Sequence, residues 1–202
     1  MRATLVAVVA ALAVSLVPPA SAGHRAPALA CPAAWAKGWI ALANKIQAPV
    51  YCPTWMPQPL NAQIGGEWQD IYAIGKDRSY LISFLYHGDL GTGDVHVNFR
   101  GYPGQTKIPT CKTIVLAGKN KTIRGTTPCF ADAQGTQTEN GIKATIYTVN
   151  QDADQWHVLF AWRYHGSLYT VSEHVIKPYT YEQVVQHLDK LLRTLVLVQP
   201  TK

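Results

Sequence analysis

The chain has 202 residues, 48% of them hydrophobic, and a formal net charge of +6 from 18 Lys and Arg against 12 Asp and Glu. About 180 residues remain after removal of an export signal, which is the length of one domain. A chain of this length buries a hydrophobic core without needing covalent cross-links to fold. Lys and Arg are scattered rather than clustered, so the charge pattern excludes a nucleic-acid footprint. The simplest interpretation of the modest excess of positive charge is that it keeps the protein soluble. The alternative is a weak attraction to an anionic wall or lipid surface.

Residues 1–22 have the pattern of an export signal. Arg2 precedes an apolar run from Ala3 to Val17, and small residues at Ala20 and Ala22 form an A-x-A cleavage site. A membrane anchor needs about 18 or more apolar residues, and this run is shorter. We therefore expect cleavage near Ala22 and a secreted or extracytoplasmic protein without a transmembrane segment. Its net charge falls from +6 to +5 when Arg2 is removed.

The four cysteines, Cys31, Cys52, Cys111 and Cys129, all lie in the exported part, where disulfides persist. Four cysteines allow three pairings, and sequence neighbours are the favoured partners: Cys31 with Cys52, and Cys111 with Cys129. Each pair closes a loop of about 20 residues and contributes roughly 3 kcal/mol on the chain-entropy estimate. The alternatives are a zinc site, although no C-x-x-C is present, and lipid modification of Cys31.

Residues 23–47 form the expected N-terminal arm. Trp35, Trp39, Leu42 and Ile46 are spaced by four, three and four residues, which is the interval of one helical face. An internal glycine and flanking prolines weaken this pattern. The arm is therefore expected to be either a short helix or an extended segment anchored by its tryptophans.

From residue 70 onward the signals become those of strands. Seven β-branched or aromatic runs are joined by turn-rich stretches rather than by helices, which predicts an antiparallel meander. The runs are DIYAIG (70–75), SYLISFLYH (79–87), DVHVNFRGY (94–102), CKTIVLAG (111–118), NGIKATIYTV (140–149), QWHVLFAWRY (155–164) and SLYTVSEHV (167–175).

The last segment, TYEQVVQHLDKLLRTLVLV (180–198), has the periodicity of a helix. Thr180 and Gln183 form a capping-box start, and Pro200 lies beyond the end. One apolar face should cover one face of the sheet. This predicts an α+β fold for a single domain over residues 48–199, with about six or seven antiparallel strands and a C-terminal helix packed on one face. The apolar face comprises Val184, Val185, Leu188, Leu191, Leu192 and Leu195.

The stretch WHVLFAWRYHGSLYTVSEHV (156–175) predicts a β-hairpin with a two-residue turn at His165 and Gly166, because glycine accepts the positive φ of such turns. Counting outward from the turn places Trp162 opposite Tyr169, and Val158 opposite Glu173, on an apolar and aromatic face. The other face is mixed, and packing alone explains most of this stretch.

The same register places His157 opposite His174, with β-carbons roughly 5 Å apart, close enough for two imidazoles to share a metal ion. His96, which alternates away from apolar neighbours in VHVNF, could supply a third nitrogen. These three histidines are the candidate metal ligands. The competing interpretation is that they simply contact water, as histidines on a polar strand face usually do.

No other motif in the sequence predicts a catalytic or ligand-binding site. Asn150, Asp152 and Asp154 alternate like the start of a calcium loop, but the required glycine and distal glutamate are missing, so a strand connection is favoured. The sequence contains no G-x-S-x-G, H-E-x-x-H or P-loop motif. We therefore predict no catalytic residues and no cofactor.

Two segments together resemble a known family. PVYCPTWMPQPL (49–60) is similar to its P-V-Y-x-P-x-x-L-P entry, with Met56 where leucine is usual, and the 156–175 hairpin followed by a T-x-x-Q-x-V helix resembles its closing elements. The family is a domain of unknown function in secreted and membrane-anchored bacterial proteins, including outer parts of some anti-sigma factors. The resemblance covers residues 48–197. It implies a curved antiparallel sheet like the half-barrel of periplasmic lipoprotein carriers, a role in binding or sensing outside the cell, and no active site.

Three functions follow as expectations. The first is a secreted, non-enzymatic binding or sensor module that holds a lipid or another cell-envelope component in the concavity of its sheet, unless the helix fills that space and binding uses the outer surface. The second is a small secreted metal-binding protein or hydrolase that uses His96, His157 or His174. The third is a structural module that binds a protein partner in the cell envelope.

Overall fold

The computed structural model describes residues 29–63, 74–86, 94–116, 122–150 and 156–201. The predicted signal peptide, and the calcium-loop-like segment beyond Asn150, lie outside the described residues. The elements in chain order are α1 (Ala33–Ile46), β1 (Val50–Pro53), the 3-10 helix η1 (Leu60–Gln63), β2 (Tyr80–Tyr86), β3 (Val95–Tyr102), β4 (Thr110–Leu116), β5 (Thr122–Pro128), β6 (Gly135–Glu139), β7 (Ile142–Val149), β8 (His157–Tyr164), β9 (Ser167–His174), α2 (Tyr181–Thr194) and β10 (Leu195–Val198).

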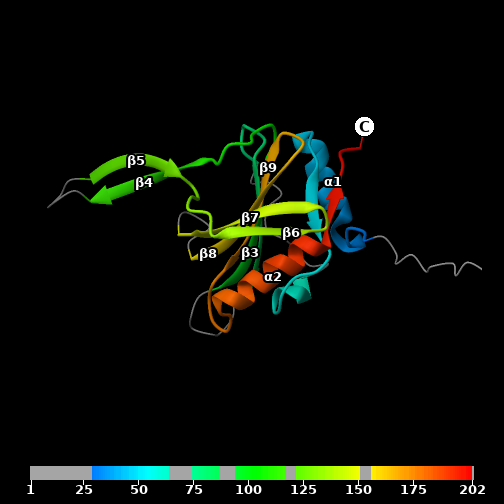
Figure 1. Ribbon diagram of the computed structural model, residues 1–202. Helices are drawn as coiled ribbons and strands as arrows, with labels where there is room; N and C mark the ends of the chain where they lie inside the picture. The colour runs from blue at the N-terminus through cyan, green and yellow to red at the C-terminus, as the bar shows by residue number, and fades with distance from the viewer. Residues whose placement is uncertain (1–28, 64–73, 87–93, 117–121, 151–155, 202) are drawn as a thin grey trace, which may run out of the picture.

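The fold is α+β, as predicted. Its centre is a six-stranded antiparallel sheet in the order β2-β3-β9-β8-β7-β6, and α2 packs across one face of this sheet (Figure 1). The sheet is not the simple meander that the sequence predicts. β9 returns to pair with β3, and β4 and β5 leave the sheet to form a two-stranded ribbon of their own. Most of the predicted DIYAIG strand lies outside the described residues, and Ile74 makes only an isolated bridge to Tyr80.

The hairpin of β8 and β9 has the predicted register. His165 and Gly166 both have positive φ, 45° and 74°, as a two-residue primed turn requires. Trp162 pairs with Tyr169, and His157 pairs with His174. Because side chains alternate along a strand, the face of each residue follows from this register.

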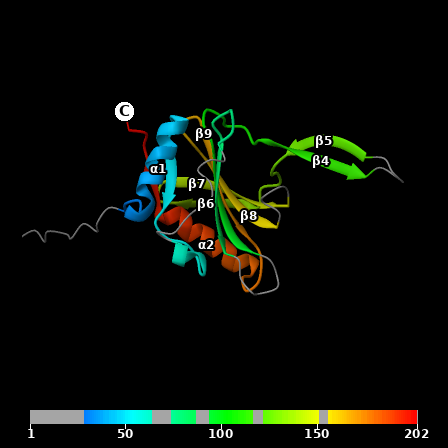
Figure 2. The same cartoon turned by 180° about the vertical axis from the view of Figure 1, so that it is seen from behind.

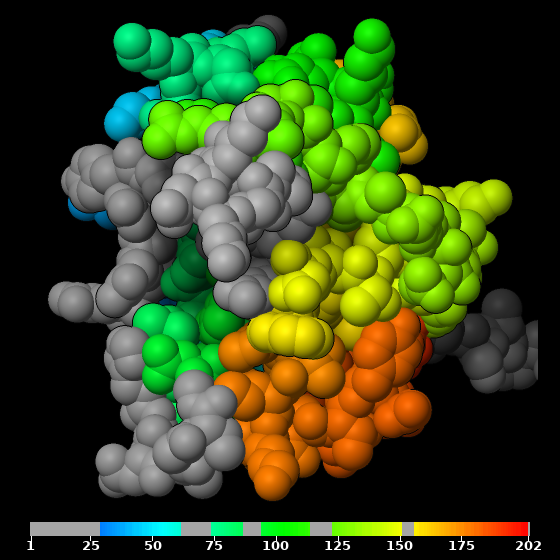
Figure 3. Space-filling view, turned by 90° about the vertical axis from the view of Figure 1, so that its left-hand side faces the viewer, coloured from blue at the N-terminus to red at the C-terminus, as the bar shows by residue number. Residues whose placement is uncertain are grey.

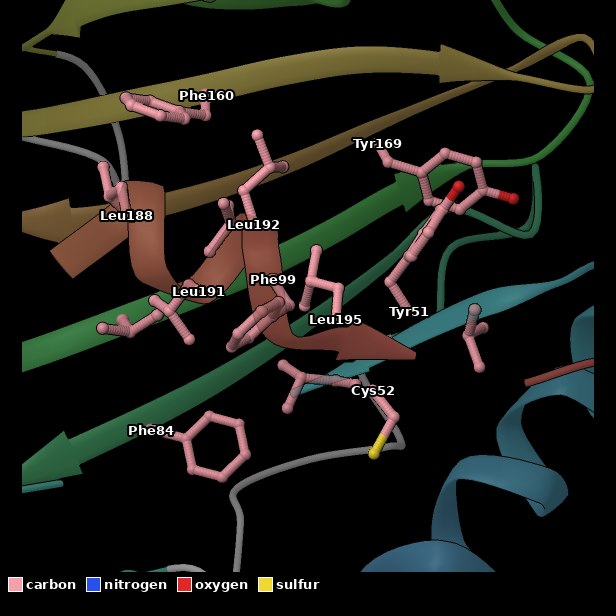
Figure 4. Packing of buried hydrophobic residues seen from close by; sticks show 14 of the residues in the cluster. Tyr51, Cys52, Phe84, Phe99, Phe160, Tyr169, Leu188, Leu191, Leu192 and Leu195 are labelled. Atoms are coloured by element: carbon pink, nitrogen blue, oxygen red, sulfur yellow. The ribbon is translucent and has the colours of Figure 1, made fainter. Parts of the chain in front are cut away.

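The α2 helix covers the inner face of the sheet. Its first turn carries the predicted capping box, in which the Thr180 hydroxyl accepts from the Gln183 backbone N–H and the Gln183 side chain accepts from the Thr180 backbone N–H. Its leucines point toward the sheet, close to Phe160 and Phe99 (Figure 4). The residues that pack the helix are fully or almost fully buried: Val184, Leu188, Leu191, Leu192 and Leu195.

The α1 helix closes the remaining part of the inner face. The Trp35 ring meets the Phe84 ring edge-on at 5.3 Å between centroids, and Trp39 meets Phe99 at 6.2 Å. The helical spacing of the N-terminal arm is thus confirmed over Ala33–Ile46, and this helix is part of the core. Beside it, a disulfide joins Cys31 to Cys52 of β1.

The chain end differs from the expectation. The helical periodicity continues through Leu195, but the helix ends at Thr194, and Leu195–Val198 form β10, which pairs with β1 in a separate two-stranded sheet. β1 and β10 lie next to α1 (Figure 2). Valines and leucines in a short run suit both a helix and a strand, and the partner strand decides between them.

Candidate functional site

The three predicted metal-ligand histidines lie together on the outer face of the sheet, the face away from α2. His157 of β8 pairs with His174 of β9. Val97 of β3 pairs with Glu173 of β9, and the two strands are antiparallel. His96, which precedes Val97, therefore lies beside His174, which follows Glu173. The row therefore crosses three neighbouring strands, and β9 provides its middle member.

The three imidazole rings converge more closely than their strands do. The His96 and His157 ring centroids are 4.5 Å apart, although β9 separates their strands, and His96 lies 4.8 Å from His174. Neighbouring strands are about 4.8 Å apart, so two strands on either side of a third are separated by roughly twice that distance. The His96 and His157 side chains therefore lean toward each other above the sheet.

One backbone carbonyl orients two of these rings. The Asp94 carbonyl oxygen lies 3.0 Å from Nδ1 of His96 and 3.0 Å from Nδ1 of His174. A carbonyl can only accept, so each Nδ1 carries the proton and donates it. When these imidazoles are neutral, their lone pairs lie on Nε2, the arrangement that a backbone partner gives to many metal-binding histidines.

The mutual orientation of the rings does not match a coordination set. His157 and His174 are stacked, with 11° between their planes and 5.2 Å between centroids. Lone pairs of imidazole lie in the ring plane, so those of two nearly parallel rings do not point at one common ion. Within the described ranges, no group of three His, Cys, Asp or Glu side chains is arranged to hold a metal ion.

Buried polar side chains continue the histidine row along the outer face. Asn98 of β3 and Ser172 of β9 form a register pair and are each 1% exposed. The Ser83 hydroxyl donates to the Asn98 side-chain oxygen at 2.6 Å. Burial of polar groups is costly unless they are hydrogen-bonded, so this polar stripe is an ordered part of the sheet rather than a solvated surface.

A second cluster of titratable groups lies on the opposite face, between β9 and α2. Glu173 is fully buried, and its Oε1 lies 2.8 Å from Nδ1 of His187. Its other oxygen, Oε2, has no hydrogen-bond partner in the described part of the chain. Burial raises the pKa of Glu173, and the bond to His187 and the charge of His187 partly oppose this increase.

Aromatic side chains surround the Glu173–His187 pair. The Tyr179 ring meets the His187 ring edge-on at 4.7 Å, and its hydroxyl donates to the Gln58 carbonyl. Burial and the nearby Glu173 charge raise the pKa of Tyr179. The ring centroids of Trp55 and His187 are 6.1 Å apart. The Lys190 ammonium lies over the Trp55 ring, 4.1 Å from its centroid. The arrangement places a carboxyl group with a raised pKa in contact with an imidazole at the interface between helix and sheet.

The Glu173–His187 pair was not predicted, although the sequence carries signals of it. The hairpin register already placed Glu173 on the apolar face opposite Val158, where a lone carboxylate needs a partner. His187 follows Val184 by three residues and precedes Leu191 by four, so it lies on the apolar stripe of the helix. What the sequence did not provide was the contact between the two elements.

The most prominent surface feature is the β4–β5 ribbon, here called the arm, which projects away from the body in both ribbon views (Figures 1 and 2). Among the described strands, these two pair only with each other, from Thr110↔Pro128 to Leu116↔Thr122. The Cys111–Cys129 disulfide closes its base. Both disulfides thus join the sequence neighbours that were favoured.

The base of the arm is anchored on the outer face of the sheet. Directly after Cys129, Phe130 is buried against Tyr147, with 4.9 Å between ring centroids. Cys129 packs against the same small apolar cluster, which includes Leu159 and Leu168. The disulfide therefore marks the boundary between the anchored chain and the projecting ribbon. Figure 3 looks from the side toward which the arm projects.

Comparison with known proteins identifies no relative. No family model, no curated protein and no solved structure matches the chain. The resemblance to the half-barrel family therefore stays a prediction. Among the described residues, no helix is long and apolar enough to cross a membrane.

Proposed function

We propose that this protein is an exported, non-enzymatic binding module that contacts a component of the cell envelope through its arm. The observation that carries this proposal is the projecting ribbon itself. A two-stranded hairpin is at best marginally stable alone in water. The arm adds no strand to the main sheet, yet a disulfide holds its base, and contact with a partner would account for such an element.

The filled inner face supports binding at the outer surface. Phe84, Phe160 and Val171 on that face are completely buried, and leucines of α2 and tryptophans of α1 pack against this core. A ligand held in the concavity would have to displace these side chains. The arm, in contrast, offers exposed side chains without any rearrangement of the core.

Export is supported by the cysteines as well as by the signal pattern. All four cysteines are paired, in two disulfides. Disulfides persist in oxidising compartments and are rare in the cytosol. The proposed location is therefore outside the cytoplasm.

A shortened arm tests this function. Lys112 and Thr126 are register partners, so replacing residues 113–125 by Asn-Gly joins them through a two-residue hairpin turn and retains the disulfide. We expect unchanged thermal unfolding of the body and at least about a tenfold weaker sedimentation with the envelope fraction of the producing cells, equivalent to about 1.4 kcal/mol.

Equal sedimentation of the shortened and intact proteins, or none for the intact protein, overturns the proposal. If the shortened chain does not fold, Ile123→Asp takes its place, because it changes one side chain that is 49% exposed. The same loss of sedimentation is then expected without a change in stability.

A second candidate function is binding of a transition-metal ion at the histidine cluster. The convergence of three imidazoles, two with Nδ1 on the Asp94 carbonyl, favours it. One of the stacked rings must first turn so that its Nε2 faces the shared ion. Titration with zinc and copper should give one site that is lost in His174→Ala and retained in His165→Ala, whose imidazole lies in the hairpin turn. No binding, or binding that survives His174→Ala, removes this candidate.

A further inference from the structure

The main sheet ends at β6, and no other described strand pairs with the outer edge of β6 (Figure 1). Glu139 pairs with Ile142 across a two-residue turn to β7, and both turn residues have positive φ. The closing pair of such a turn exchanges both of its backbone hydrogen bonds. The direction of hydrogen bonding alternates along a strand. Thr136 and Thr138 therefore direct their backbone N–H and C=O groups away from β7.

These outward groups are accessible and unpaired. Thr136 and Thr138 are exposed, and in the part of the chain that the structure describes no residue bonds to their outward backbone groups. Natural sheets usually protect such an edge with lysine, proline or a covering element. The β6 sequence, GTQTE, contains neither lysine nor proline, and Arg193 pairs with its one carboxylate, Glu139, at 3.1 Å. The edge is therefore an electrically neutral template for another strand.

The alternate side chains of β6 hold the strand on α2. The Gln137 side chain donates to the Asp189 carboxylate at 2.6 Å, and Glu139 accepts from Arg193. Both contacts lie on the inner face of the sheet, so they leave the edge open. A strand that is already ordered loses less conformational freedom when it pairs.

We infer that β6 pairs antiparallel with β6 of a second copy of this chain, about a two-fold axis at Gln137. In this register Thr136 of each copy faces Thr138 of the other, so every outward backbone group of both strands finds a partner. Any other two-fold register leaves some of these groups without one. Threonines that face each other across a strand pair are also favourable neighbours.

The side chains of the inner face fit the same register. Gly135 faces Glu139 of the second copy, and nothing lies within 4 Å of a Cβ placed on Gly135. Space therefore remains for that glutamate and for the Arg193 bound to it. Because the charged side chain of β6 faces a glycine, like charges of the two strands do not meet. This self-complementarity selects a second copy over a foreign extended peptide.

The length of the seam determines how strong the dimer is. β6 has five residues, whereas stable interfaces bury about 1,200–2,000 Å² of surface, and a seam of this length buries less. The dimer is therefore weak and reversible. It does not depend on the function proposed for the arm.

Sedimentation velocity of the mature chain at rising concentration, up to about 1 mM, tests for this dimer. The average sedimentation coefficient should increase with concentration. Thr136→Lys with Thr138→Lys places lysines opposite each other and should weaken association at least about tenfold. The matched control, Thr126→Lys with Thr148→Lys, adds the same charge at exposed threonines of β5 and β7, and association should stay within about threefold of the intact protein.

A cysteine cross-link reads out the register. The two-fold axis places the Cβ atoms of both copies of position 137 roughly 4.5 Å apart, as a pair without backbone hydrogen bonds. Gln137→Cys should therefore form a covalent dimer on mild oxidation, since the four native cysteines are already paired. Lys143→Cys is the control, because it lies on β7 opposite Thr138, and its two copies would be about 14 Å apart.

A chain that stays monomeric at about 1 mM, or equal cross-linking of the two cysteine variants, overturns the inference. Association that survives Thr136→Lys with Thr138→Lys belongs to another surface and overturns it as well. Thermal unfolding shows whether this variant folds. If it does not, Thr138→Pro takes its place, because proline removes an outward N–H that the single chain does not use.

Discussion

Gly101 of β3 leaves the space that the ring of Tyr80 occupies. The two residues are register partners, and a Cβ placed on Gly101 would lie 2.3 Å from Cε1 of Tyr80. Tyr80 is itself 4% exposed, and burial raises the pKa of its hydroxyl well above the ordinary value. Because the Tyr80 ring is buried, a Cβ at position 101 would force the ring or its surroundings to shift, so the glycine determines how β2 and β3 pack.

Gly101→Ala should therefore destabilise the protein by about 1–3 kcal/mol through overpacking. Gly135→Ala is the control, because nothing lies within 4 Å of its added Cβ, and this change should leave stability equal or slightly higher. Urea unfolding monitored by tryptophan fluorescence measures both. Equal stabilities of the two variants would contradict the packing role of Gly101.

Glu173 should make stability fall as pH rises. Its raised pKa, which burial causes against the opposing bond to His187, means that the folded state holds the proton more tightly than the unfolded chain does. Stability from this group is complete below the unfolded pKa of about 4.5 and is lost as pH rises through the folded pKa. Glu173→Gln does not titrate, so its stability relative to the intact protein should increase from acid toward neutral pH.

Urea unfolding of both proteins at several pH values between about 4.5 and 7 provides this comparison. His165→Gln is a suitable control, since His165 lies in the β8–β9 turn, stacked on Tyr164. A stability difference between Glu173→Gln and the intact protein that stays flat or shrinks with rising pH would refute the assignment.

The two disulfides should stabilise different parts of the molecule. Cys31–Cys52 ties the start of α1 to a fully buried residue of β1, so Cys31→Ala with Cys52→Ala should cost about 3 kcal/mol of global stability for a loop of this size. Cys111–Cys129 closes the arm. Its removal should change global stability by less than about 1 kcal/mol, and not by the roughly 3 kcal/mol expected from loop size alone, because local opening of such an element is separate from global unfolding.

Limited trypsin digestion separates these effects, since Lys112 and Arg124 are exposed cleavage sites on the arm. Cys111→Ser with Cys129→Ser should be cut there much faster than the intact protein, with its thermal transition retained. A large drop in the unfolding temperature of this variant would show that the arm is part of the cooperative core.

Leu191 of α2 should be among the residues on which folding depends. It is completely buried against the inner face, and Leu191→Ala is expected to cost about 2–5 kcal/mol. Gln186→Ala on the exposed side of the same helix should have almost no effect. Circular dichroism during thermal unfolding measures both variants. A small loss for Leu191→Ala would mean that the helix does not hold the sheet.

The sequence alone determined the features that depend on neighbours along the chain. The capping box at Thr180 and the turn at Gly166 each act within a few residues, so periodicity and turn chemistry suffice to predict them. The spacing of Trp35 and Trp39 indicated a helix but left an extended segment open, and the structure has the helix. The same short-range register placed His157 opposite His174. The pairing of cysteines that are neighbours in the sequence was also the favoured one, and both disulfides have it.

Only the tertiary structure decided the features that join distant segments. The pairing of β3 with β9 brought His96 to the other two histidines, and the docking of α2 brought His187 to Glu173. Pairing with β1 turned Leu195–Val198 into a strand, and the exclusion of β4 and β5 from the main sheet created the arm. Such contacts depend on the free energy of packing between whole elements, which no local pattern of residues specifies.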